Sequence, residues 1–301
     1  MSVSVTGLTK IYSGQKAVDN ISFNVKSGEV LGFLGPNGAG KSTTMKIISG
    51  FIPPTEGKAT VCNFDVETQS LEARKNIGYL PENNPLYPDM YVKEFLHFTG
   101  KLNGVKNRNA RVKEMIGIVG LQVEQRKKIG ALSKGYRQRV GIAQALLHDP
   151  KVLIMDEPTS GLDPNQLADI RELIKNLGKE KTVILSTHIM QEVQAICNRV
   201  IIISKGKIVA DDSVEKLQSG NSNDVSTKVT FKNSVSKEAL RKIKGVNKAD
   251  SISENTWLLH SSFNNEEEIF QFAVEQKNII TSMTNEQLGL EDIFRELTKG
   301  K

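Results

Sequence analysis

The stretch that most constrains this chain is GPNGAGKST at residues 35–43, because it fits the pattern G-x-x-x-x-G-K-[ST]. The fixed positions of the pattern are Gly35, Gly40, Lys41 and Ser42. Glycines let successive backbone N–H groups curl around an anion, and a helix that starts at the lysine adds its positive dipole end. The stretch therefore predicts a phosphate-binding loop.

The flanking sequence meets the structural context that this loop requires. Residues 30–34 form an apolar run that predicts a buried strand, and residues 41–49 predict a helix. A glycine-rich turn between a strand and a helix is the alternative, but the strand, the spacing, the lysine and the hydroxyl together favour nucleotide binding. We expect Lys41 to neutralise the β- and γ-phosphates and Ser42 to coordinate Mg²⁺. The residues expected to contact the nucleotide here are Gly35, Pro36, Asn37, Gly38, Ala39, Gly40, Lys41, Ser42 and Thr43.

The composition of the chain is compatible with several classes of globular protein. With 301 residues, 38% hydrophobic and 25% charged, the chain is long enough for one large domain and a smaller one. A net charge of +6 could suit nucleic acid or an anionic membrane surface, but it is small for this length. Cys62 and Cys197 lack the spacing of a metal site, which indicates two reduced thiols.

The sequence contains no segment that predicts membrane insertion or secretion. No window holds the ~18 uncharged apolar residues of a membrane helix, and the first ten residues alternate without an apolar signal core. We therefore expect a cytoplasmic protein.

The order of periodic segments predicts a fold that mixes an antiparallel β part with an α/β core. Alternation over residues 3–12 and 20–25 predicts antiparallel strands before the loop, and residues 58–64 predict another strand after it. Residues 92–149 are helical in period and predict an inserted group of helices. Further strands are expected at 151–155 and 181–187, separated by a helix over 164–178.

A second chemical site is predicted at the end of the strand in KVLIMDEPTSGLD. The apolar run 152–155 places Asp156 and Glu157 at the carboxyl end of a strand, where open α/β sheets bind ligands. One carboxylate can hold Mg²⁺ and the other can polarise an attacking water. An acidic strand end is often only structural, but together with Lys41 on the loop the pair indicates catalysis.

The segment LSKGYRQRVGIAQALLHDPKVLIMDEPTSGLDP resembles the signature-to-Walker-B region of ATP-binding-cassette (ABC) ATPases. The resemblance runs in motif order from about residue 3 to about residue 217. It implies an ABC-type P-loop NTPase domain over 1–218, with an antiparallel β part, a RecA-like core and a helical subdomain at about 90–149. Within the family, GYLPENNPLYPDMYVKEFL and LSTHIMQEV resemble the ATPase subunits of gliding-motility-associated transporters.

The resemblance implies roles for further residues. Tyr12 matches the aromatic that stacks on adenine, although it could simply end an amphipathic strand. Ser133 and Gly135 match the signature motif, whose helix start faces the ATP held by a second copy. Asp163 resembles the aspartate that crosses the dimer, and His188 the histidine that senses the γ-phosphate.

The chain departs from the family pattern at two places. The signature, usually L-S-G-G-Q, has Lys134 and Tyr136 at its third and fifth positions. Glu82 replaces the glutamine of the Q-loop, and an ionised glutamate only accepts hydrogen bonds. We expect Glu82 to approach Mg²⁺ and the coupling helix of a partner, so the predicted metal ligands are Ser42, Asp156 and Glu82. The predicted catalytic residues are Glu157, as general base, and His188.

The composition breaks at QSGNSND, residues 218–224, and a second pattern follows. Residues 225–301 predict strand, helix, two strands, helix and strand, with helices over 236–244 and 265–276. This β-α-β-β-α-β order is that of a ferredoxin-like α+β unit. A last helix is expected over 290–298, and Trp257 is expected in the core. No catalytic constellation is visible, which favours a regulatory, dimerising or docking role.

The resemblance implies an ATP-hydrolysing subunit that uses ATP and Mg²⁺ to drive transport, leaning toward export. Its partners would be integral-membrane permease subunits on separate chains and a second copy, or a homologous ATPase subunit, in a head-to-tail dimer. It would be peripheral on the inner face of the cell membrane, with no nucleic acid expected. A soluble ABC ATPase acting on DNA or ribosomes is the alternative, disfavoured by a single P-loop and by no basic run longer than residues 126–128. A non-catalytic nucleotide-binding regulator is disfavoured by the intact Asp156–Glu157 pair.

Overall fold

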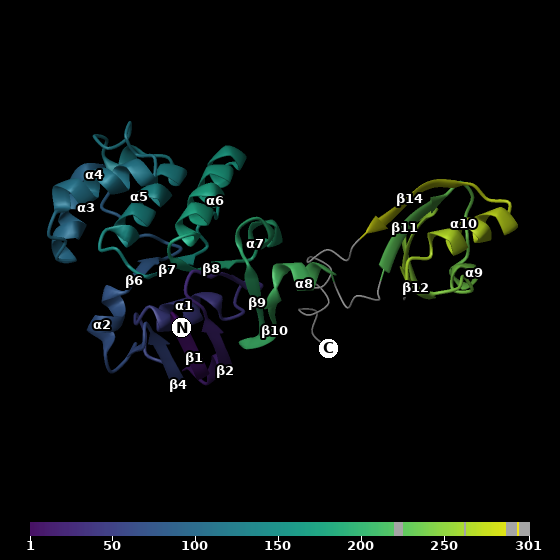
Figure 1. Cartoon of the computed structure of the whole chain (residues 1–301), viewed down its shortest axis with the longest axis horizontal. Helices are drawn as coiled ribbons and strands as arrows, with labels where there is room; N and C mark the ends of the chain where they lie inside the picture. Colours follow the sequence, from purple (N-terminus) through teal and green to yellow (C-terminus); the bar gives the residue numbers. More distant parts are fainter. Residues whose placement is uncertain (220–224, 262, 287–293, 295–301) are drawn as a thin grey trace. The chain divides into compact units, whose positions relative to one another are not determined.

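The computed structural model describes residues 1–219, 225–261, 263–286 and 294, and it divides into two compact units (Figure 1). The first unit is Met1–Val214 and the second is Glu215–Lys301. Among the described residues, no helix combines the length and the apolar character needed to cross a membrane.

The first unit contains an antiparallel sheet of four strands in the order β2-β1-β4-β5. Its strands are β1 (Val3–Tyr12), β2 (Gln15–Val25), β4 (Glu56–Val61) and β5 (Phe64–Asp65). The prediction of one strand over 58–64 is wrong, because Cys62 and Asn63 adopt positive φ angles of 50° and 70°. These two residues form the tight turn between β4 and β5.

The second sheet of this unit positions the candidate site. Its six strands follow the order β10-β9-β3-β8-β7-β6, all parallel except β10, which is antiparallel to β9. They are β3 (Val30–Leu34), β6 (Ile77–Leu80), β7 (Val152–Asp156), β8 (Thr182–Thr187), β9 (Arg199–Ser204) and β10 (Lys207–Ser213). Strands β3, β7 and β8 are fully buried, as expected for parallel strands covered on both faces. The carboxyl ends of these three neighbours meet at one edge of the sheet.

The helices of the first unit lie around these sheets (Figure 1). They are α1 (Lys41–Ile48), α2 (Ser70–Lys75), α3 (Val92–Leu102), α4 (Arg108–Ile118), α5 (Lys134–Leu146), α6 (Pro164–Gly178) and α7 (Met190–Ile196), with a 3₁₀ turn at Ile129–Ala131; α8 (Val214–Ser219) follows. Helix α6 begins where Pro164 follows the capping side chain of Asp163, an arrangement typical of helix starts. Helices α3, α4 and α5 form the inserted helical group that the sequence predicts. The main core includes α1 and both sheets, with the rings of Phe23 and Phe33 5.5 Å apart.

From residue 225 onward, the described part of the second unit forms one antiparallel sheet and the two helices α9 and α10. Its elements are β11 (Val225–Phe231), α9 (Lys237–Leu240), β12 (Val246–Ser253), β13 (Thr256–Ser261), α10 (Glu266–Glu275) and β14 (Ile280–Glu286). The strand order is β12-β13-β11-β14, with every pair antiparallel. Trp257 is 8% exposed and belongs to the core of this unit, which confirms its expected place.

Helix α9 is shorter than the predicted helix over 236–244. Ser236 caps its start by accepting a hydrogen bond from the backbone N–H of Ala239. The chain then passes through turns to Gly245, whose φ of 89° lets it enter β12. The helix expected over 290–298 lies outside the described residues, apart from Phe294.

Candidate functional site

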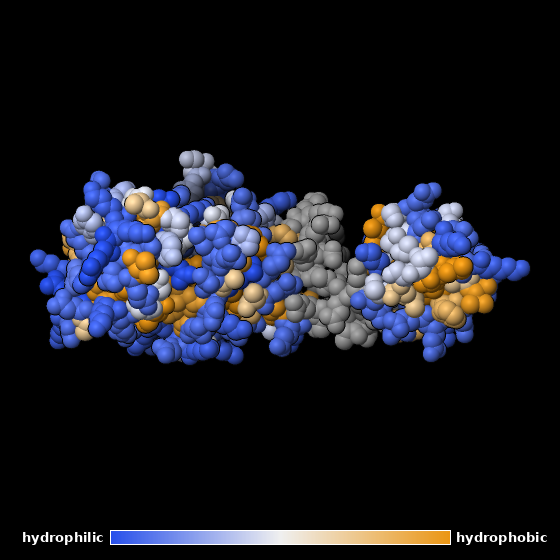
Figure 2. All heavy atoms as spheres, turned by 90° about the horizontal axis from the view of Figure 1, so that it is seen from above, coloured by the Kyte–Doolittle hydropathy of each residue, from blue (hydrophilic) through white to orange (hydrophobic). Residues whose placement is uncertain are grey.

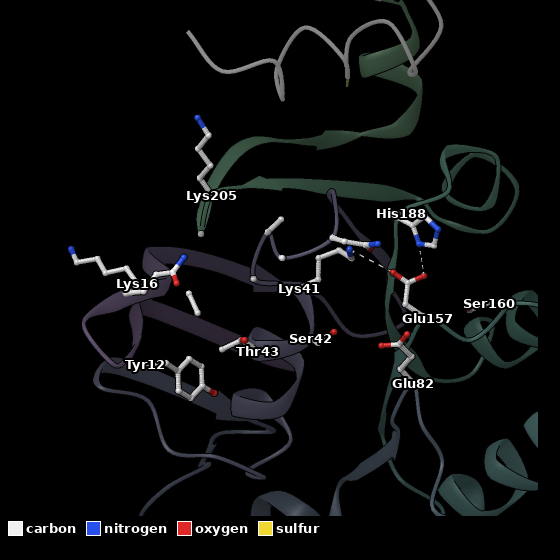
Figure 3. A pocket seen from close by; sticks show the side chains of 17 residues that line it. Tyr12, Lys16, Lys41, Ser42, Thr43, Glu82, Glu157, Ser160, His188 and Lys205 are labelled. Atoms are coloured by element: carbon white, nitrogen blue, oxygen red, sulfur yellow. Dashed lines mark hydrogen bonds and ion pairs between the residues drawn. The ribbon is translucent and has the colours of Figure 1, made fainter.

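A cavity of about 780 Å³ lies at the carboxyl ends of β3, β7 and β8 (Figure 3). It brings together residues from the phosphate-binding loop, the first hairpin and the segments after β6, β7 and β8. The predicted site residues that line it are Tyr12, Asn37, Gly38, Ala39, Gly40, Lys41, Ser42, Thr43, Glu82, Glu157 and His188. The structure thus places in one cavity groups that are more than a hundred positions apart in the sequence.

The loop glycines are required for two different reasons. A Cβ atom at Gly35 would overlap the carbonyl oxygen of Ile203, and one at Gly40 would overlap that of Ala17. Gly38 instead has open space where a Cβ would lie, and its φ is 77°. Gly38 and Gly40 both hold positive φ angles, which L side chains rarely adopt. The loop backbone is therefore free to approach an anion closely.

Lys41 is 5% exposed and is held by oxygen atoms on several sides. Its Nζ donates to the carbonyl oxygens of Gly35, at 2.8 Å, and Pro36, at 3.2 Å. It also lies 3.5 Å from Oε1 of Glu157. These contacts fix the ammonium at the mouth of the loop, where a phosphate group would be a strong anionic partner.

Ser42 and Asp156 meet beside the lysine, and their chemistry fits Mg²⁺. The hydroxyl of Ser42 donates to Oδ1 of Asp156 at 3.0 Å, and the hydroxyl of Ser186 donates to the same oxygen. Glu82 lines this cavity and also the adjoining one that contains Ser42 and Asp156. Hydroxyl and carboxylate oxygens are the ligands that Mg²⁺ prefers, usually completed by water and substrate phosphates. Among the described residues, no group of three or more His, Cys, Asp or Glu could hold a metal ion without such help.

Glu157 is 8% exposed and lies in the left-handed region, with a φ of 50°. Its backbone N–H donates to the carbonyl and hydroxyl oxygens of Ser186, at 3.1 and 3.2 Å. Its Oε2 lies 2.9 Å from Nδ1 of His188, on the opposite side from Lys41 (Figure 3). Burial raises the pKa of this carboxyl, although His188 and Lys41 act in the opposite direction. A carboxylate with a raised pKa and a fixed orientation is suited to accept a proton from water.

His188 follows β8 directly and remains 44% exposed at its side chain. An ionised Glu157 only accepts hydrogen bonds, so Nδ1 of His188 carries the hydrogen in this contact. His188 can thus orient the carboxylate of Glu157.

Tyr12 lies at the far end of the cavity from Glu157 and His188 (Figure 3). Its ring is 46% exposed, and the Nζ of Lys10 lies 5.4 Å from the ring centroid. An exposed aromatic face at the end of a phosphate site is suited to stack on a nucleotide base.

The sequence did not identify Lys16, Ser160, Lys205 and Gly206, which also line the cavity. Lys16 belongs to β2, where its Nζ lies 2.7 Å from Oδ1 of Asp19, while Lys205 and Gly206 form the turn between β9 and β10. No spacing pattern marks Lys16, Lys205 and Gly206, because they reach the site only through the pairing of strands. Ser160 instead follows Glu157 by three positions in the loop between β7 and α6. Lys205 adds positive charge to the cavity, whereas the charge of Lys16 is paired with Asp19.

The structure does not bring Ser133, Gly135 and Asp163 into this cavity. Ser133 caps α5 by accepting from the N–H of Tyr136, and Asp163 caps α6 by accepting from the N–H of Gln166. The Nε2 of Gln166 also donates to the hydroxyl of Ser133 at 3.4 Å. A Cβ at Gly135 would overlap the side chain of Gln166. Within one chain these residues therefore form a separate group at the starts of two helices.

Comparison with known proteins identifies the relatives of this chain. The family model described as "ABC transporter" matches residues 18–160. The bacitracin transport ATP-binding protein BcrA of Bacillus licheniformis is 40% identical over 221 residues, which cover 73% of this chain and 72% of that protein. An uncharacterized ABC transporter ATP-binding protein of Bacillus subtilis, YcbN, is 32% identical over 300 residues, or 99% of this chain and 97% of its own. A solved dimeric ATP-binding cassette bound to ADP and Pi matches with a TM-score of 0.65 and 28% identity, over 70% of this chain and 98% of its own.

Proposed function

Because this chain belongs to the family of ABC transporter ATP-binding proteins, we propose that its cavity hydrolyses ATP to drive transport through membrane subunits on separate chains. The observation that carries the proposal is the meeting of Lys41, the Ser42–Asp156 pair and the Glu157–His188 pair in one place. Each contact supplies one requirement of phosphoryl transfer, namely charge neutralisation, metal coordination and activation of water.

Each group of residues has a separate role in the proposed reaction. Lys41 and the loop N–H groups hold the phosphates, and Tyr12 stacks on the base. Glu157 accepts a proton from a water molecule whose oxygen attacks the γ-phosphorus, and the bond from that phosphorus to the β–γ bridging oxygen breaks to release ADP. Ser42 and Asp156, with Glu82 nearby, would hold Mg²⁺, which would supply neutralisation of the phosphate charge. His188 keeps the carboxylate of Glu157 directed at the water.

We further propose that Ser133, Gly135 and Asp163 act on the ATP of a second copy in a head-to-tail dimer. Their position outside the cavity of their own chain supports this assignment, as does the start of the 13-residue helix α5 at Ser133. The solved cassette that resembles this chain is described as dimeric. Each chain would then contribute the P-loop to one ATP and a helix start to the other.

We assign residues 1–218 as the ATP-binding domain, with its helical subdomain at about 90–149, and 225–301 as a ferredoxin-like accessory domain. The strand order β12-β13-β11-β14, with α9 between β11 and β12 and α10 between β13 and β14 along the chain, supports the second assignment. The relative from Bacillus subtilis that aligns over 99% of this chain includes this region as well.

We propose that the chain lies at the inner face of the cell membrane and that the transport it drives is export. One relative is named for bacitracin transport, which supports a transport role. The narrower link to gliding motility depends on the sequence segments alone, since neither protein relative compared above is named for it. No observation favours an action on DNA or ribosomes.

Replacing Glu157 by Gln tests the proposal. Loss of the general base is expected to lower ATP turnover by about 10²- to 10⁴-fold while ATP binding is retained. Glu172→Gln, on the exposed face of α6, is the matched control and should leave turnover unchanged. Parental turnover in the Glu157→Gln protein would exclude the assignment.

The same variant, loaded with ATP and Mg²⁺, can capture the partners from membranes of the source cell. Recovery of polytopic membrane proteins is the expected result. Recovery of ribosomal proteins or nucleic acid without any membrane protein would contradict the transport function and leave the ATPase chemistry intact.

A further inference from the structure

Helix α10 carries two apolar side chains on the face that is turned away from the core of the second unit. Ile269 and Ala273 are 0% and 3% exposed and pack into the core of the unit. Phe270 and Val274, one position further along, are 60% and 61% exposed. Because they lie four residues apart, they are adjacent on the helix surface. A helix that buries one face would ordinarily be polar on the other.

The exposed pair belongs to a larger surface. A shallow cavity of about 310 Å³ beside it is lined by Glu266, Glu267, Phe270, Gln271 and Met283. Figure 2 shows hydrophobic side chains gathered on the visible face of the second unit. We call Glu267, Phe270, Gln271 and Val274 the α10 surface. Contiguous apolar groups next to a hollow are typical of a protein-binding face, whereas isolated ones are not.

Helix α10 is also acidic, although the chain as a whole has a net charge of +6; Glu267 belongs to the α10 surface and Glu266 lines the hollow beside it. Residues 263–277 carry four glutamates and one lysine. The helix dipole favours the three glutamates in the first turn, but it disfavours Glu275 in the last turn. Glu267 is exposed, while Glu266 accepts a hydrogen bond from Asn285 at 2.6 Å. Exposed negative charge beside an apolar pair is complementary to a partner that carries positive charge.

The charge argues against a second copy as the occupant of this surface. In a symmetric dimer through α10, the same surface of both chains would meet, and their glutamates would repel each other. A basic segment with its own apolar face would satisfy both features, because it would pair with the glutamates and cover Phe270 and Val274.

We propose that the α10 surface binds a basic amphipathic helix in a cytoplasmic segment of the transporter's membrane subunit. This inference rests on the proposed function, which requires such a subunit. Cytoplasmic segments next to membrane spans are enriched in Lys and Arg, which is the chemistry that this surface accepts. The second unit is then a docking module, and it adds a contact to those made by the ATP-binding domain.

The first test is photo-crosslinking in the full-length chain purified together with its membrane subunits. A photoreactive amino acid is introduced at Phe270 or, separately, at Val274. The control position is Ile252, which is 52% exposed on β12 of the same unit. Crosslinks to a polytopic membrane protein are expected from 270 and 274 and not from 252.

The second test is the charge of the surface. Glu267→Lys should weaken that crosslink about ten-fold, because it reverses an exposed charge beside Phe270, and the parental crosslink should weaken as salt is added. Glu254→Lys, in the exposed turn between β12 and β13, introduces the same charge elsewhere and should have no effect. Circular dichroism of both variants establishes that the unit remains folded.

The possible failures are distinguishable. If membrane subunits co-purify but 270 and 274 do not crosslink to them, the docking site is excluded and the transport function stands. Crosslinks from 270 or 274 to a second copy, or within the same chain, would also exclude the proposed docking site. If no membrane protein co-purifies at all, both proposals fail.

Discussion

Glu157 is positioned between two side chains that favour its ionised form, yet burial raises the pKa of its carboxyl above the ordinary value of 4.5. The base must be ionised to accept a proton, so ATP turnover should fall as the pH drops through this raised pKa. His188 lowers the pKa of Glu157. His188→Ala should therefore move the acidic limb of the pH–kcat/KM profile to higher pH, in addition to reducing the rate.

The pH profile of His97→Ala provides the control for this prediction. His97 lies on α3 and does not line the cavity, so its removal should leave the acidic limb in place. An acidic limb in His188→Ala that stays where it was, or moves to lower pH, would show that His188 does not influence the ionisation of Glu157.

Tyr12 should contribute to affinity for the nucleotide base without taking part in hydrolysis. Stacking of a base on an aromatic ring is worth ~1–3 kcal/mol, so Tyr12→Ala should weaken ATP binding about 5- to 150-fold. Tyr12→Phe keeps the ring and should bind ATP nearly as well as the parent. The dissociation constant of a fluorescent ATP analogue measures both variants, and equal values for Tyr12→Ala and the parent would exclude stacking.

At the scale of single residues, the sequence was informative where chemistry follows a local pattern. Lys41, Asp156 and Glu157 stand in short motifs at strand ends, and the structure places them together. Lys16 and Lys205 could not be found in this way, because hairpins and strand order alone bring them to the rim. Contacts between strands that are distant in the sequence cannot be predicted from the local spacing of residue types.

The next scale is that of the helices, and α6 provides a test there. Asp163 caps this helix by accepting from the N–H of Gln166 at 2.9 Å. Asp163→Ala should destabilise the first unit by about 1 kcal/mol, which corresponds to a fall of about 2–4 °C in its thermal midpoint. Asp163→Asn retains a capping oxygen and should nearly restore that midpoint.

The two variants also separate the cap from the proposed role in the dimer. If Asp163 acts only as a cap, Asp163→Asn should have parental ATP turnover. If it also crosses the dimer as a charged group, Asp163→Asn should lose turnover while keeping its stability. A midpoint for Asp163→Ala equal to that of the parent would contradict the capping contribution.

Long elements with a clear period were predictable, and short ones were not. The helix over 164–178 has the predicted bounds, because it has a buried stripe and a clear start. Strand β6, of four residues, and helices α2 and α7, of six and seven, are too short to show a period. Helix α9 ends early because the chain must turn at Gly245 to enter β12, a requirement of the sheet that helix propensity does not contain.

For the whole molecule, the two units have separate described cores that share no residue. Two cores predict two thermal unfolding transitions, since each unit can lose its packing independently. ATP with Mg²⁺ should raise the midpoint of the first unit alone, because a ligand stabilises only the structure that binds it. Calorimetry on Glu157→Gln, which should hold ATP without turnover, measures this effect.

Two outcomes of the calorimetry would contradict that prediction. A single transition that moves as one with ATP would show that the units unfold together. A shift confined to the second unit would place the nucleotide elsewhere. The same scan with Lys41→Ala, which removes the loop ammonium, should show no shift with ATP.

Gln166 connects the starts of helices α5 and α6, which lie outside the cavity. Its backbone binds the cap of α6, and its side chain binds the cap of α5 and occupies the space beside Gly135. The starts of the two helices are thus fastened to each other by one amide side chain. A displacement of one helix start would therefore have to break the 3.4 Å hydrogen bond between Gln166 and Ser133 or move the other start with it.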